Sequence, residues 1–181
     1  MLLEKKLGHK LLEVARKAID AGLTNTDPTP ERIEDPLLNQ EAGCFVTINK
    51  DGQLRGCIGN FVSSQPLYLE VAKMAIAAAT ADPRFYAMSS EDIGKYSLDI
   101  SILSPLIKID DIMLIEVGTH GLYLEKDYSR GVLLPQVASE QGWDRQTFLE
   151  QTCIKAGLPT DAWQSPQITI SIFSAQVITD N

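Results

Sequence analysis

Residues 54–59, Leu-Arg-Gly-Cys-Ile-Gly, carry the side chains of this sequence that are best suited to chemistry. Arg55 and Cys57 stand two residues apart, so on a β-strand their side chains point to the same face. A nearby guanidinium favours the thiolate form of a cysteine, which is the nucleophilic form. Gly56 and Gly59 leave little side-chain cover, so a substrate or partner backbone can come close. This pattern predicts a reactive cysteine.

A structural role is the alternative for Cys57. If a second layer covers this face, the thiol is a small core residue and the glycines only permit tight packing, because buried inert cysteines are common. The residues alone leave these two interpretations open.

The other two cysteines support free thiols in a reducing compartment. The chain has three cysteines, an odd number, and no C-x-x-C spacing, so neither a disulfide framework nor a zinc site is indicated. We expect Cys44 and Cys153 to be core residues. A redox sensor built on Cys57 would therefore lack a nearby resolving cysteine.

His120 is a candidate base. It lies in the glycine-flanked segment Gly-Thr-His-Gly, and an imidazole titrates near neutral pH, so it suits a general base or a thiolate partner. The alternative is a turn histidine that hydrogen-bonds the backbone. No second histidine or cysteine stands at metal-ligand spacing, so no metal site is predicted.

Asp82 and Arg84 flank Pro83 directly after a predicted helix. Arg84 could bind a ligand carboxylate or phosphate through its planar fork of donors. The alternative, which we favour, is that the pair locks its own loop. If these residues act with Cys57, then Arg55, Asp82, Arg84 and His120 should converge with it on one concave surface.

The face that Cys57 occupies depends on the turn before it. A two-residue Asp51-Gly52 turn pairs Lys50 with Gln53 and places Cys57 opposite Val46. A three-residue loop over 50–52, with Gly52 left-handed, pairs Asn49 with Gln53 and separates the apolar and polar faces more cleanly. We therefore predict the three-residue loop, with Arg55 and Cys57 on one face.

Apolar spacing and end signals predict the elements that hold these residues. Pro66 suits a first helical turn, Asp144 suits an N-cap, and Gly157 suits a helix end. We expect helices at 3–22, 66–81 and 144–156, and strands at 43–48, 53–59, 97–103, 121–125, 132–134 and within 167–178. Several strand pairs are hairpins, so the predicted fold class is α+β with mixed or antiparallel sheets and packed helices.

Composition excludes several classes of function. The formal net charge is -8 and the basic residues form no cluster, which disfavours nucleic acid and anionic membranes as partners. The longest apolar stretch, 74–81, is too short to span a bilayer, and no signal peptide is visible, so a cytoplasmic location is expected. No G-x-S-x-G, P-loop, G-x-G-x-x-G or H-E-x-x-H pattern occurs, and no cofactor is predicted.

Six blocks of the sequence, in this order, resemble the AMMECR family, also called protein A of the AmmeMemoRadiSam system. They are residues 54–59 followed by Phe61, 82–85, 120–122, 133–137, 142–143 and 155–158. The resemblance implies one α+β domain over 1–181, made of two closely packed lobes with the 54–59 motif near the cleft between them. It also implies a Memo-like protein and a radical SAM protein as partners. It implies no settled enzymatic activity.

Two functions follow as hypotheses. The first is a cysteine-dependent enzyme or covalent carrier, with Cys57 as nucleophile, Arg55 stabilising the thiolate or a bound anion, and His120 as base. The second is a non-catalytic module whose cleft binds a small molecule or a partner's peptide. Exposure of the Cys57 sulfur and a base within hydrogen-bond reach would favour the first.

Overall fold

The computed structural model describes residues 3–180 and builds them into two four-stranded sheets with helices. The chain forms two compact units, which we call unit 1 (Met1–Leu103 and Gln176–Asn181) and unit 2 (Ser104–Ala175). The predicted α+β class is confirmed. No helix within residues 3–180 is both long and apolar enough to cross a bilayer.

Two helices form one layer of unit 1. They are α1 (Lys5–Leu23) and α2 (Leu67–Thr80), and both were expected from the sequence. In α1 the residues at helical spacing are buried, among them Leu11, Ala15 and Ile19. The alanines of α2 let the two helices pack closely, and Ala18 contacts the apolar surface that contains Ala72. Each helix therefore buries one apolar side against the sheet.

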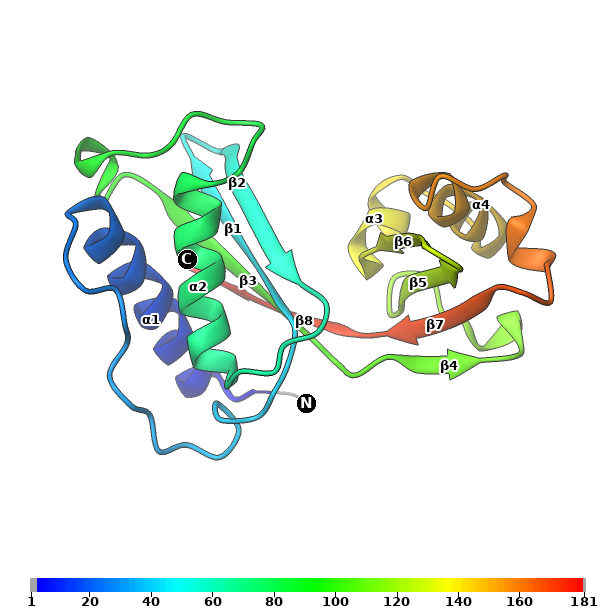
Figure 1. Ribbon diagram of the computed structural model, residues 1–181, viewed down its shortest axis with the longest axis horizontal. Coiled ribbons are helices and arrows are strands. Elements are labelled where there is room, and N and C mark those ends of the chain that lie inside the picture. Colours follow the sequence, from blue (N-terminus) through cyan, green and yellow to red (C-terminus); the bar gives the residue numbers. More distant parts are fainter. Residues whose placement is uncertain (1–2, 181) are drawn as a thin grey trace. The chain divides into compact units, whose positions relative to one another are not determined.

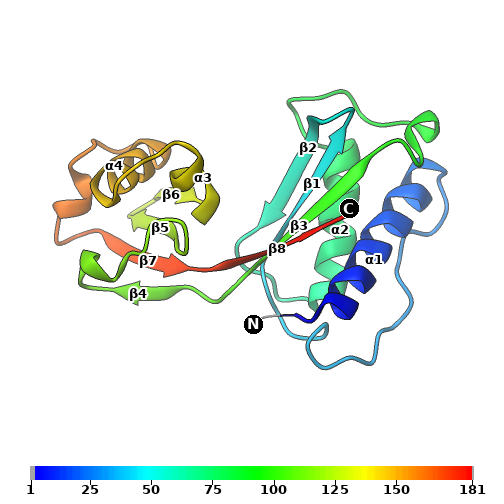
Figure 2. The same cartoon turned by 180° about the vertical axis from the view of Figure 1, so that it is seen from behind.

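The sheet of unit 1 has the strand order β2-β1-β3-β8. Its strands are β1 (Cys44–Lys50), β2 (Gln53–Asn60), β3 (Ser97–Leu103) and β8 (Ala175–Thr179). Both helices lie against the same face of this sheet, as the two opposite views show (Figures 1 and 2). Side chains on that face, such as Val46, Ile48 and Ile100, are fully buried. The alternate residues of each strand point to the helix-free face.

The predicted turn before β2 is wrong. Lys50 pairs with Gln53 across a two-residue Asp51-Gly52 turn, in which both residues have positive φ, 52° and 73°. The backbone twist of such a turn matches the twist of the strands it joins. A β-bulge then inserts Arg55 as an extra residue, because Ile48 pairs with Gly56 while Asn49 pairs with Leu54.

The bulge explains why, beyond it, the expected face of Cys57 survives the different turn. Beyond it, Thr47 pairs with Cys57, and Val46 pairs with Ile58. Cys57 therefore lies on the helix-free face with Thr47, while Gly56 and Ile58 share the core face. Cys44 is fully buried, as predicted.

Unit 2 has its own sheet with the strand order β4-β7-β5-β6. Its elements are β4 (Ile107–Ile109), β5 (Gly121–Lys126), β6 (Ser129–Leu133), β7 (Thr169–Phe173), α3 (Pro135–Glu140) and α4 (Arg145–Lys155). Asp144 caps α4 by accepting a hydrogen bond from the Thr147 backbone N–H, as predicted. Gly157, at φ 73°, ends it, and the N–H of Leu158 reaches back to the Cys153 carbonyl. Cys153 itself is fully buried in this core.

Candidate functional site

Cys57 lies on β2 at the edge of the unit 1 sheet, with its side chain on the helix-free face. The thiol is half-buried. The hydroxyl of Thr47, directly across on β1, donates a hydrogen bond to Sγ of Cys57 at 3.3 Å. This hydrogen bond orients the sulfur towards β1. The site therefore differs from those of Cys44 and Cys153, which are fully buried.

Asp82 and Arg84 hold the backbone of Cys57 from outside the sheet. A carboxylate oxygen of Asp82 accepts the Cys57 N–H at 2.8 Å, and Nη2 of Arg84 donates to the Cys57 carbonyl at 3.2 Å. These two side chains supply the acceptor and the donor that a neighbouring strand would supply. We call this pair the Asp82–Arg84 clamp. It fixes the backbone of Cys57 and blocks one position of an otherwise open sheet edge.

The clamp is held together by its own ion pair. Nε of Arg84 donates to one oxygen of Asp82 at 2.9 Å and Nη2 donates to the other at 2.7 Å, and the Arg84 backbone N–H adds a third bond at 3.1 Å. Asp82 is only 5% exposed. The hydrogen bonds from the Arg84 side chain, above all, hold the pKa of Asp82 well below its usual range, against the effect of burial. Asp82 is therefore ionised at neutral pH.

The guanidinium that interacts with Cys57 belongs to Arg84. Its pKa is raised, first by the hydrogen bonds to Asp82 and further by Cys57. The Arg84 side chain is 54% exposed, so the guanidinium also faces solvent. The favoured interpretation of Asp82 and Arg84, that they lock their own loop, agrees with this geometry. The same contacts also bring the Arg84–Asp82 ion pair next to Cys57.

Arg55 makes its contacts elsewhere. Its Nη2 donates to the Tyr86 carbonyl at 2.6 Å, and its guanidinium carbon lies 5.9 Å from the centre of the Phe85 ring. Its Nη1 is buried and has no hydrogen-bond partner among residues 3–180. Arg55 therefore fastens the bulge to residues 85–86. The contacts to Cys57 that sequence analysis expected from Arg55 come from Arg84.

The two glycines of the motif permit close packing. A Cβ on Gly56 would lie 2.1 Å from the Ala78 carbonyl oxygen of α2, so α2 packs directly on the backbone of β2. A Cβ on Gly59 would lie 2.4 Å from the Phe45 ring and 2.3 Å from the Cys44 carbonyl oxygen. Gly56 therefore serves the core face, opposite to Cys57. Gly59 lies on the same face as Cys57, next to the Phe45 ring.

His120 belongs to unit 2, whereas Arg55, Cys57, Asp82 and Arg84 belong to unit 1. The backbone N–H of Glu116 donates to Nδ1 of His120 at 3.2 Å, and the His120 N–H donates to the Glu116 carbonyl. Nδ1 is thus an acceptor, so the neutral ring carries its proton on Nε2. This geometry matches the turn histidine considered above. The pairing of His120 with Cys57 stays a prediction.

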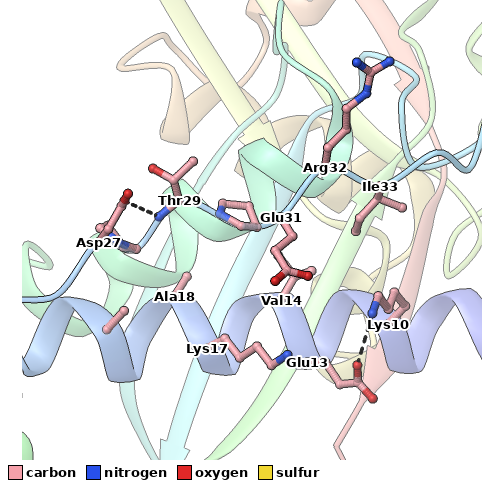
Figure 3. A pocket seen from close by; sticks show the side chains of 13 residues that line it. Lys10, Glu13, Val14, Lys17, Ala18, Asp27, Thr29, Glu31, Arg32 and Ile33 are labelled. Carbon is pink, nitrogen blue, oxygen red and sulfur yellow. Dashed lines mark hydrogen bonds and ion pairs between the residues drawn. The ribbon is translucent and has the colours of Figure 1, made fainter.

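A pocket of unit 1 lies away from these residues, between α1 and the extended segment 27–33. Its volume is about 510 Å³, and Figure 3 shows its lining. Val14, Ala18 and Ile33 contribute apolar surface, and charged side chains of both signs surround it, with Lys10 paired to Glu13 at 3.6 Å. Because basic and acidic side chains both line this pocket, its charges favour neither an anionic nor a cationic ligand.

No metal site is indicated among the described residues. Residues 3–180 hold no group of three or more His, Cys, Asp or Glu side chains suited to a metal ion.

Comparison with known proteins agrees with this fold. The crystal structure of an uncharacterized protein from Pyrococcus horikoshii is similar with a TM-score of 0.86 and 36% sequence identity, over 97% of this chain and 92% of that one. A protein of Methanothermobacter thermautotrophicus is 38% identical over 99% of this chain and 97% of its own length. A protein of Methanocaldococcus jannaschii is 40% identical over 99% and 92%. The sequence profile named AMMECR1 matches residues 12–178. The chain belongs to the AMMECR1 family.

Proposed function

We propose that this AMMECR1-family protein uses Cys57 as a nucleophile, as a cysteine-dependent enzyme or a covalent carrier. The observation that carries the proposal is the pair of donors at one half-buried thiol: the Thr47 hydroxyl on Sγ, and the Arg84 guanidinium, which interacts with Cys57. Hydrogen-bond donors and a guanidinium next to a cysteine are typical surroundings of cysteine nucleophiles. The clamp holds the Cys57 backbone in place, so the sulfur is presented in one position.

The carrier form has the stronger support within unit 1. Asp82 is ionised, but its two oxygens already accept four hydrogen bonds, so it is a poor base for the thiol. A cysteine thiolate can attack an activated carbonyl without a base, whereas repeated turnover needs proton transfer in each cycle. His120 remains the proposed base if the protein is an enzyme. The free state of all three cysteines supports action in a reducing compartment such as the cytoplasm.

A binding module is the second candidate, and exposed apolar side chains beside the site favour it. Tyr86 is 94% exposed and Leu54 is 43% exposed, and Arg55 joins the two segments through the Tyr86 carbonyl. Exposed apolar groups next to a polar site are typical of surfaces that bind another protein. The resemblance to protein A of the AmmeMemoRadiSam system makes a Memo-like protein and a radical SAM protein the proposed partners.

Reaction with an ester distinguishes an enzyme, a covalent carrier and a binding module. With p-nitrophenyl acetate, attack of the Cys57 sulfur on the carbonyl forms a thioester and releases p-nitrophenolate. We expect a rapid release of about one p-nitrophenolate per chain, because one thiol per chain is activated. A carrier then stops, whereas an enzyme that hydrolyses the thioester continues. The variant Cys57→Ala should lose the rapid phase, and a wild-type protein without that phase would leave the binding module as the function.

Matched variants test which groups activate the thiol. Arg84→Gln should slow the rapid phase about tenfold, because the guanidinium that interacts with Cys57 is removed. Thr47→Val, which keeps the shape and removes the donor, should slow it about threefold. Arg55→Gln should change the rate less than about twofold, because Arg55 makes its contacts with residues 85–86. Equal effects of the Arg84 and Arg55 variants would refute the assignment to Arg84.

A further inference from the structure

β2 is an edge strand, and its outer side is open at Gly59. No strand follows β2 in the order β2-β1-β3-β8, and Figure 1 shows it at the border of the unit 1 sheet. The Cys57 N–H and C=O are held by the Asp82–Arg84 clamp. They are therefore not bonded to β1, which makes Thr47 and Cys57 a non-hydrogen-bonded pair of the antiparallel ladder.

The alternation of the ladder then fixes the direction of the Gly59 backbone groups. Bonded and non-bonded pairs alternate, so the pair Phe45 and Gly59, two residues along, is also non-bonded. The bond from the Leu103 N–H to the Gly43 carbonyl agrees with this alternation, since it shows that the odd-numbered residues of this part of the chain bond towards β3. The Gly59 N–H and C=O therefore point outward from the sheet edge. Within residues 3–180 neither group makes a hydrogen bond outside the strand ladder.

An added strand can pair with β2 over only a short length at this open position. The clamp occupies the place opposite Cys57, two residues or about 7 Å along the edge from Gly59. β2 runs from Gln53 to Asn60, so a chain added antiparallel runs from Gly59 towards Cys57. Such a chain must end beside the clamp, and the end that arrives there is its C-terminus.

Arg84 offers donors for the carboxylate at that end. Its Nε and Nη2 donate to Asp82 and to the Cys57 carbonyl, and the guanidinium also interacts with the Cys57 side chain, whereas Nη1, with two N–H groups, makes no hydrogen bond to an oxygen within residues 3–180. The side chain is 54% exposed. Two N–H donors on a cation suit a carboxylate, and a chain in the parallel direction would bring an ammonium group there instead.

The side chain next to the terminus has a defined surface. The residue opposite Gly59 projects to the same face as Gly59, where the Phe45 ring packs against the glycine. Phe45 and Phe61 form an edge-to-face pair with ring centres 4.9 Å apart. An apolar penultimate residue would contact this aromatic pair.

From these observations we propose that the edge of β2 binds the C-terminal peptide of another protein. The penultimate residue pairs with Gly59 and the terminal carboxylate lies at Nη1 of Arg84, next to Cys57. Extended peptides commonly bind by adding a strand to a sheet edge. This proposal rests on the proposed function, because that function makes the surface around Cys57 important. It deepens that function by naming the class of ligand that binds there. Peptide binding itself needs no reactive thiol.

Hexapeptide pools test the proposal. One pool carries fluorescein at the N-terminus, random residues other than cysteine at the last four positions, and a free carboxylate. We expect it to bind by fluorescence polarisation and to shift the Gly59 amide signal in the ¹⁵N spectrum of the intact protein. The same pool with a C-terminal amide should bind about tenfold more weakly, because the charge-assisted bonds to Arg84 are lost. An unmoved Gly59 signal, or equal binding of both pools, overturns the proposal.

Backbone methylation of the peptides supplies a matched control that leaves the protein unchanged. Methylating the nitrogen of the penultimate residue removes the donor to the Gly59 carbonyl and should abolish the Gly59 shift. Methylating the nitrogen of the terminal residue, which points away from β2, should preserve it. Equal tolerance of both methyl groups refutes strand addition.

The two proposals fail in different ways. If Cys57→Ala binds the carboxylate pool like the wild type while the wild type shows no p-nitrophenolate burst, the peptide site stands and the nucleophile is abandoned. If the burst occurs and the Gly59 signal does not move, only the peptide site is abandoned.

Discussion

Replacing Asp82 with alanine should lower the free energy of unfolding by about 2–3 kcal/mol. The substitution removes a carboxylate that is 5% exposed, and it leaves the Cys57 N–H without its acceptor. Loss of one partner from a buried charge-assisted network costs more than a surface ion pair, although the 54% exposure of Arg84 lets water replace part of the interaction. Urea unfolding followed by circular dichroism measures the change.

Asp92→Ala supplies the control in the same unit. Asp92 pairs with Lys50 at 2.6 Å, but the two side chains are 16% and 32% exposed. We expect a loss of about 1–2 kcal/mol, because this pair is better hydrated and Asp92 also accepts the Ser89 N–H at 2.9 Å. If Asp82→Ala is no more destabilising than Asp92→Ala, the clamp is not a main support of the sheet edge.

The pKa of Asp82 also sets the direction of a pH effect. Its folded-state pKa lies below the unfolded value of about 3.9, because the hydrogen bonds from Arg84 stabilise the carboxylate. This contribution is complete above the unfolded pKa and is lost as the pH falls from about 4 through the folded pKa. The wild type should therefore lose its advantage over Asp82→Ala in strong acid. A difference that stays constant from pH 7 to pH 2 would contradict the assignment.

Gly56→Ala should destabilise the protein by about 2 kcal/mol. The added methyl group would lie 2.1 Å from the Ala78 carbonyl oxygen, and that oxygen belongs to a helix backbone that cannot move alone. Overpacking of this kind typically costs 1–3 kcal/mol. Gly52→Ala is the control, since its Cβ meets nothing within 4 Å, yet its φ of 73° disfavours alanine by about 1 kcal/mol. Gly56→Ala with an effect below that of Gly52→Ala would show that α2 does not pack on the strand as described.

Elements with a clear local pattern could be predicted from the sequence. The helical spacing of Leu11, Ala15 and Ile19 is sufficient for α1, and Asp144 and Gly157 mark the two ends of α4. These signals lie within a few residues of the structure they predict. No such signal showed that residues 167–178 form two strands, β7 and β8. That run was expected as one β-rich segment, but it changes sheet at Ser174, because its two halves pair with β5 and β3 in different units.

The candidate site could be predicted in part. The hairpin and the side of the strand on which Cys57 lies were predicted, and the structure agrees, since Cys57 pairs with Thr47 on the helix-free face. The turn was wrong because either loop length fits the Asp51-Gly52 pair, and the bulge at Arg55 compensates for the difference. The contact between Asp82 and Cys57 joins residues 25 apart, through a backbone N–H that no side-chain pattern records. For that reason sequence analysis assigned to Arg55 the contacts that Arg84 makes.

Alkylation of the folded protein by iodoacetamide at pH 7, with mass spectrometry of each cysteine peptide, tests most directly whether Cys57 is the reactive thiol. We expect Cys57 to react at least about 100-fold faster than the other two thiols, which react only through opening of the fold. Cys44 and Cys153 are fully buried, and burial raises the pKa of both. In urea all three should react at similar rates. A Cys57 that reacts as slowly as Cys44 in the folded protein would contradict the account.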